Sequence, residues 1–92
     1  MVSSYLACYD IRDPKRLARV FRCLKSVGIH LQYSVFHCRL TYTELLQLKG
    51  NLKDIINERE DDVRIYPLPS KGSVTIFGCG DRVPEGVNLF LR

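Results

Sequence analysis

The alternation of strand-like and helical patterns along the first forty residues limits the fold most. An apolar run from Val2 to Asp10 ends in a carboxylate and indicates a strand covered on at least one face. The chain then turns at Asp13, whose side chain can cap a helix, and Pro14 suits the first helical position because it has no N–H to leave unpaired. A helical repeat of apolar residues follows, and we expect Gly28 to end it.

The rest of the chain adds strands and a second helix. Ile29 to Arg39 is interpreted as a strand, with a bend within Val35 to Leu40 that separates a further short strand. Thr41 and Glu44 have capping-box spacing ahead of a second helical repeat. Residues 62–68 alternate polar and apolar side chains, which is typical of a half-exposed strand.

This order, β-α-β-β-α-β, predicts an α+β fold with a ferredoxin-like sheet and both helices on one face. The right-handed crossover rule places the first strand in the middle of the sheet beside the third. Two further strand-like runs, Ser73–Cys79 and Val87–Leu91, lie outside this unit. They are expected to extend the sheet or pair with another chain, because an uncovered edge invites aggregation. We predict one domain over residues 1–92, with a core of about 1–70 and a C-terminal strand extension of about 71–92.

The charge balance favours a polyanionic partner. The 92 residues include 14 Lys and Arg against 10 Asp and Glu, a net charge of +4 that a homodimer would double. So short a chain has a modest core, which makes help from a second subunit plausible. The predicted first helix carries five bases on one face: Lys15, Arg16, Arg19, Arg22 and Lys25. Such a face is often merely solvated, but no acid occurs between Pro14 and Gly28, which favours contact with phosphates.

Four cysteines are scattered along the chain without a C-x-x-C pair, and neither histidine has zinc-ligand spacing from a cysteine pair. We interpret the cysteines as reduced thiols of a cytoplasmic protein. The chain does not start with a secretion signal, and no window reaches the apolar length of a membrane span. A soluble, unexported protein without a membrane partner is therefore expected.

Five short motifs occur in register from about Tyr5 to Leu68, roughly three quarters of the chain. In order they are Tyr9-Asp10-Ile11, Asp13-Pro14-Lys15-Arg16-Leu17, Gly28, Gln32-Tyr33-Ser34-Val35-Phe36 and Ile65-Tyr66-Pro67-Leu68. Together they closely resemble the CRISPR-associated protein 2 family. The first and fourth motifs at this separation are the most specific part of the resemblance.

The resemblance implies a ferredoxin-like homodimer whose C-terminal strands pack onto the partner's sheet. The family helps to capture foreign DNA fragments into CRISPR arrays, as a central dimer that bridges integrase subunits. Several members are described as magnesium-dependent endonucleases on RNA or double-stranded DNA. By this resemblance Asp10 binds Mg²⁺, or another divalent cation, shared between the protomers. Phe36, at the end of the second predicted strand, and an arginine of the first helix, Arg16 or Arg19, match other positions linked to activity.

Such chemistry is physically reasonable for a dimer. Two Asp10 carboxylates across a two-fold axis supply few ligands and leave room for waters, an arrangement that Mg²⁺ prefers and that lowers the pKa of a bound water. Positive side chains that suit contact with nearby phosphates are Lys15, Arg16 and Arg19. Tyr9 and Phe36 are included with Asp10 as candidate catalytic residues. Either ring could stack on a base, or it could simply line the interface or pack.

Alternatives remain at this level. Asp10 can also be a strand-ending carboxylate that accepts backbone hydrogen bonds, whereas Ser34 lacks a recognisable triad partner and is rejected as a nucleophile. The leading hypothesis is an endonuclease that acts in spacer acquisition with the CRISPR integrase. The alternative is a non-catalytic, DNA-binding scaffold that bridges the integrase complex. A toxin or regulatory module on the same scaffold is more remote.

Overall fold

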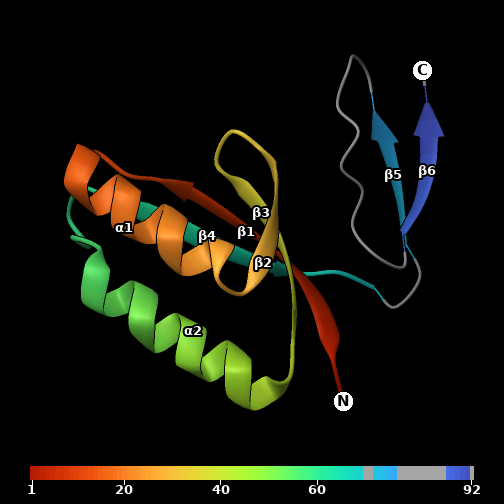
Figure 1. Ribbon diagram of the computed structural model, residues 1–92, viewed down its shortest axis with the longest axis horizontal. Coiled ribbons are helices and arrows are strands. Elements are labelled where there is room, and N and C mark those ends of the chain that lie inside the picture. The colour runs from red at the N-terminus through yellow and green to blue at the C-terminus, as the bar shows by residue number, and fades with distance from the viewer. Residues whose placement is uncertain (70–71, 77–86, 92) are drawn as a thin grey trace.

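The computed structural model describes residues 1–69, 72–76 and 87–91 of the 92-residue chain. Figure 1 shows the elements in these ranges. In chain order they are β1 (Ser3–Asp10), α1 (Pro14–Lys25), β2 (Gly28–Gln32), β3 (Val35–Leu40), α2 (Tyr42–Ile55), β4 (Asp62–Pro67), β5 (Gly72–Ile76) and β6 (Val87–Leu91).

Four strands form one antiparallel sheet in the order β2-β3-β1-β4. Strand β1 lies in the middle and pairs with β3 on one side and β4 on the other, as the crossover rule predicted. Both helices lie on the same side of this sheet (Figure 1). The prediction of an α+β chain with a four-stranded sheet and two helices is therefore confirmed.

The division between β2 and β3 was placed wrongly from the sequence. We expected a bend within Val35–Leu40, but the chain reverses at Tyr33 and Ser34, and Val35–Leu40 is one uninterrupted strand. Tyr33 has a φ of 38°, in the left-handed region that a tight hairpin turn requires. Glycine or asparagine normally occupies such a position, so the sequence carried no turn signal there. As a result, Phe36 lies near the start of β3 and not at the end of the preceding strand.

Local capping interactions fix where both helices begin. The Asp13 side chain accepts a 2.9 Å hydrogen bond from the backbone N–H of Arg16, which confirms the predicted cap of α1. Thr41 and Glu44 form the predicted capping box at the start of α2, with bonds of 3.2 and 2.8 Å. Helix α1 ends at Lys25, however, and Gly28 begins β2 instead of closing the helix. Neither described helix has the length and apolar character needed to cross a membrane.

The core lies between the sheet and the helices. Every second residue of the central strands faces the helices, and the apolar stripes of α1 and α2 cover them. The buried apolar residues are Ala7, Tyr9, Val20, Leu24, Phe36, Cys38, Leu40, Leu45, Leu48 and Leu52. No helix covers the opposite face of the sheet, where Ile29 and Tyr66 are each about half exposed. We refer to this second surface as the open face.

The C-terminal strands form a separate ribbon. Strands β5 and β6 pair in parallel, from Gly72 opposite Val87 to Ile76 opposite Leu91. Among the described strands they pair only with each other, and Figure 1 shows the ribbon standing apart from the four-stranded sheet. The predicted strand Ser73–Cys79 is described as far as Ile76, and its last residues lie outside the described ranges. Pairing of these strands with a partner's sheet stays a prediction.

The two described glycines with defined surroundings give a matched test of the packing. A Cβ at Gly28 would lie 2.6 Å from both Cys38 Sγ and the backbone oxygen of His37. Since the backbone oxygen cannot rotate away, Gly28→Ala should lower the free energy of unfolding by about 1–3 kcal/mol.

A Cβ at Gly50, inside α2, would meet nothing within 4 Å. Gly50→Ala should therefore raise stability by about 1 kcal/mol. Urea denaturation at one fixed protein concentration measures both, and equal effects would contradict the packing at Gly28.

Candidate metal and nucleic-acid site

Asp10 ends β1 at an exposed position. The preceding residue, Tyr9, is buried towards the helices, and side chains alternate along a strand, so Asp10 projects to the open face. Its partner across the β1–β4 ladder is Asp62, whose side chain projects to the same face. The fold thus brings two carboxylates together at one end of the open face.

This pair has the character of a cation site. Like charges directly opposite each other in a sheet repel, and Arg64 offsets part of the charge through a 3.0 Å ion pair with Asp62. Exposed carboxylates with room for waters suit Mg²⁺, which keeps much of its hydration shell. No group of three or more His, Cys, Asp and Glu side chains suited to a metal occurs in the described ranges. One protomer therefore offers a partial ligand set.

Sequence reasoning identified Asp10 but missed Asp62. The two residues lie 52 positions apart, and only the strand register places them opposite each other. The polar start of the strand at residue 62 was visible in the sequence, but a pairing register depends on the whole sheet.

Arg16 is engaged within the protein. Its Nε donates to Asp61 Oδ2 at 2.7 Å, and its Nη2 donates to Glu60 Oε1 at 2.9 Å and to Asp61 Oδ1 at 3.1 Å. The side chain of Asp61 is fully covered in this contact. The sequence suggested a phosphate contact for Arg16, but here the guanidinium joins the start of α1 to the loop between α2 and β4. Its role in this fold is to position these segments.

Asp61 is the centre of this junction. Besides Arg16, its carboxylate accepts hydrogen bonds from the backbone N–H groups of Arg12 at 3.0 Å and Asn57 at 2.8 Å. The Arg16 hydrogen bond is the largest of the effects that lower the pKa of Asp61 well below its usual range. The junction holds the turn that follows Asp10 against the loop that precedes Asp62. Asp10 and Asp62 therefore both lie next to segments that this junction holds in place.

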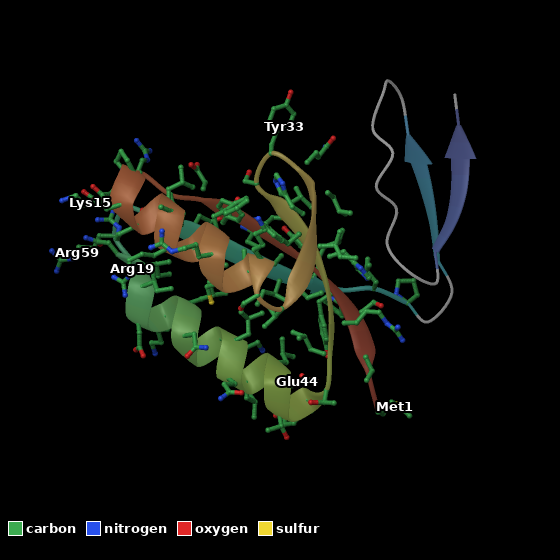
Figure 2. The ribbon with its side chains drawn as sticks, in the orientation of Figure 1. Met1, Lys15, Arg19, Tyr33, Glu44 and Arg59 are labelled. Carbon is green, nitrogen blue, oxygen red and sulfur yellow. The ribbon has the colours of Figure 1, made fainter. Side chains whose placement is uncertain are left out.

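The other bases of α1 extend into solvent. Figure 2 shows Lys15 and Arg19 on α1, and Arg59 in the loop after α2, with their charged ends directed away from the core. No ion pair joins Lys15, Arg19 or Arg22 to any other described residue. Helix α1 itself contains no acidic residue. These side chains therefore form a positive surface that is available to an anionic partner.

Phe36 and Tyr9 lie inside the core. Phe36 is 0% exposed and packs against Phe21 and His30, with ring centroids 5.4 and 4.8 Å away. Tyr9 is 7% exposed and lies 6.2 Å from the Phe36 ring. The sequence left stacking on a base and packing as alternatives for both rings. Their burial favours the packing alternative, and a catalytic role for either ring stays a prediction.

The described cysteines, Cys8, Cys23 and Cys38, are all free thiols, as the sequence indicated. Burial raises the pKa of all three, and it raises that of Cys38, with a smaller contribution from nearby Cys23, to about 11. They are therefore protonated at neutral pH, which disfavours a nucleophilic role. Cys79 lies outside the described residues.

Comparison with known proteins gives one family. The sequence model described as "CRISPR associated protein Cas2" matches residues 3–76. A protein of Thermodesulfovibrio yellowstonii named "CRISPR-associated endoribonuclease Cas2 2" is 54% identical over 86 residues, which cover 94% of this chain and 94% of that protein.

Two solved structures share the fold. A hypothetical protein of Thermus thermophilus, TT1823, superposes with a TM-score of 0.84 at 34% identity, over 92% of this chain and 100% of the other. Streptococcus pyogenes Cas2 superposes with a TM-score of 0.68 at 35% identity, over 72% of this chain and 86% of the other. The similarity therefore includes the candidate site and extends along most of the chain.

The Asp61 junction predicts a pH dependence. The pKa of Asp61 is lower in the folded protein than its ordinary value of 3.8, so the stability that its ionised form contributes is fully present above that value. That stability is lost as the pH falls towards the lower, folded pKa. Asp61→Asn should be less stable than the wild type at pH 7, and the difference should shrink between about pH 5 and pH 2.

Chemical denaturation across this pH range, at one protein concentration, measures the effect. The matched control is Asp54→Asn, because Asp54 is exposed on α2 and forms no ion pair with another described residue. A constant difference between Asp61→Asn and the wild type at every pH would contradict the role assigned to the Asp61 carboxylate.

Proposed function

The chain belongs to the CRISPR-associated Cas2 family, and we propose that it acts in CRISPR adaptation as a homodimer with divalent-metal-dependent endonuclease activity on RNA or double-stranded DNA. The observation that carries this proposal is the exposed Asp10, at the end of a central strand and directly across from Asp62. The name of the Thermodesulfovibrio relative supports nuclease chemistry.

A second copy of the chain would cover the open face. Ile29 and Tyr66 are large, partly solvent-exposed apolar residues on this face, and burying them against a partner favours association. A two-fold axis through this face would bring the site of one protomer towards that of its partner. The strand order and the placement of both helices on one face support a ferredoxin-like unit in each protomer.

Within this dimer Asp10 from each protomer would hold Mg²⁺ or another divalent cation, with Asp62 close by. When bound, the cation supplies charge neutralisation at the scissile phosphate and a water of lowered pKa. Lys15 and Arg19 would bind phosphates on either side of the cleaved bond, while Arg16 would keep the β1–α1 turn in place. The buried rings of Tyr9 and Phe36 would support β1 from the helix side.

A non-catalytic bridge is the second candidate. The β5–β6 ribbon stands apart from the four-stranded sheet, which leaves it accessible to another protein such as the CRISPR integrase subunit. The bases of α1 would then bind duplex DNA through its backbone, without cleavage. We assign the complex to the cytoplasm, and the free thiols support this assignment. Bridging and cleavage are compatible in one protein.

The nuclease proposal is tested by Asp10→Asn. This change removes one negative charge at an exposed position, so the fold should persist while cleavage of RNA or duplex DNA with Mg²⁺ falls by about a hundredfold or more. Asp54→Asn, an exposed change of the same kind on α2, should cleave at the wild-type rate. Rates are measured on proteins purified identically. Equal rates for Asp10→Asn and the wild type would indicate a contaminating nuclease and defeat the proposal.

The bridge proposal is tested by deleting Val87–Arg92, which removes β6. If the ribbon is the docking surface, the truncated protein should lose spacer acquisition in cells that carry the matching integrase. Asp10→Asn should retain acquisition if only the bridge is needed. Acquisition at the normal level after the deletion would exclude β6 as the docking surface. Circular dichroism of the truncated protein checks that the remaining fold persists.

A further inference from the structure

A groove lies between α1, the β2–β3 turn and the end of β1. Its volume is about 550 Å³, within the range of about 300–1,000 Å³ that is typical of small-molecule sites. Its lining is mainly apolar and comes from Tyr9, Pro14, Leu17, Ala18, Phe21, Arg22, Tyr33 and Ser34. Leu17 is exposed, so part of this apolar surface faces water. The groove lies on the helix side of the sheet, away from the open face.

Tyr33 forms the outer rim of the groove. The residue is 89% exposed, and Figure 2 shows its side chain at the tip of the β2–β3 hairpin, directed away from the body of the protein. Its φ of 38° is unfavourable for a side chain of this size. A contact of 2.5 Å between His30 Nε2 and the Tyr33 carbonyl oxygen helps to hold the turn. Strain retained at an exposed aromatic residue suggests that the ring itself is needed there.

The rim of the groove is positively charged. Arg22 lines it, and Arg19 lies one helical turn earlier. Neither is in an ion pair with another described residue, and α1 has no acid to compete for them. An apolar cavity with an exposed ring and unpaired cations complements a ligand that has a flat face and a negative charge.

We propose that this groove binds one unpaired base of a single-stranded nucleic acid, with the base against Tyr33 and its phosphate on Arg22. The proposal rests on the nucleic-acid function proposed above and adds a preference for unstacked bases. A base inside a duplex has both faces covered, so only a single strand can offer one to the groove. The charge of the rim favours a nucleotide over an apolar peptide segment.

The groove and the candidate metal site lie on opposite faces of the sheet, at the same end of β1. Tyr9 lines the groove, and Asp10, the next residue, projects to the opposite face of the sheet. A strand that places a base in the groove would therefore pass the end of β1 close to Asp10. The groove base would then lie near the scissile phosphate in sequence, and its fit would influence which bond is cleaved.

The test uses a short single-stranded oligonucleotide with one central 2-aminopurine, and the same oligonucleotide in a duplex. Binding to the full-length protein is measured without added metal, so that cleavage cannot occur. Stacking on Tyr33 should quench 2-aminopurine fluorescence in the single strand. Tyr33→Ala should weaken single-strand binding by between about five- and a hundredfold and abolish the quenching, while duplex affinity stays within about twofold.

Matched variants isolate the ring. Tyr33→Phe should bind like the wild type, because the aromatic face remains. Tyr42→Ala removes another exposed tyrosine, 71% exposed on α2, and should leave single-strand binding unchanged. Arg22→Gln should weaken binding and reduce its salt dependence, whereas Lys53→Gln on α2 should not.

Tyr33→Gly separates binding from folding. Glycine adopts the left-handed region without a steric penalty, so this variant should unfold at a urea concentration equal to or higher than the wild type while losing the quenching. Equal quenching by the wild type and Tyr33→Ala would overturn the proposal, as would equal weakening of single-strand and duplex binding. Asp10→Asn should quench normally. Loss of cleavage without loss of quenching therefore distinguishes the metal site from the groove.

Discussion

The part-buried contact between Arg16 and Asp61 is the interaction on which the rest of the site depends. It joins residues 45 positions apart, and the same carboxylate also receives the backbone N–H groups of Arg12 and Asn57. One fully covered acid thereby ties the segment after β1 to the segment before β4. Because Asp10 ends β1 and Asp62 begins β4, the junction supports the register that sets these two carboxylates opposite each other. The Arg16 guanidinium, for which the sequence suggested a phosphate contact, therefore stabilises the fold.

The groove and the candidate metal site lie on opposite faces of the sheet. Along β1, Tyr9 points to the helices and lines the groove, while Asp10 points to the open face. A shift of register by one residue would bury Asp10 and expose Tyr9, so the two surfaces depend on the same alternation. A nucleic acid bound at both surfaces would have to pass over the end of β1. The positive side chains of α1, including Lys15 and Arg19, lie on the helix side of that path.

Features set by neighbouring residues could be predicted, and features set by distant residues could not. The caps at Asp13 and Thr41 and the order of the first elements follow from contacts only a few positions apart. The position of the β2–β3 turn was predicted wrongly because Tyr33 adopts a left-handed conformation that is unusual for tyrosine. Phe36 was taken as a site candidate, yet its burial depends on Phe21 and His30, which lie on other elements.

The sequence alone determined the element order, the helix starts and the positive face of α1, because each depends on residue type and short spacing. Asp10 was identified as the candidate metal ligand through the resemblance of its motif to a known family. Only the tertiary structure decided that Arg16 pairs with Asp61, that Asp62 stands across from Asp10, and that a groove opens beside Tyr33. These features join segments through strand register and helix packing. Register is a property of the whole sheet, since each strand is fixed by its neighbours and by the face that it buries.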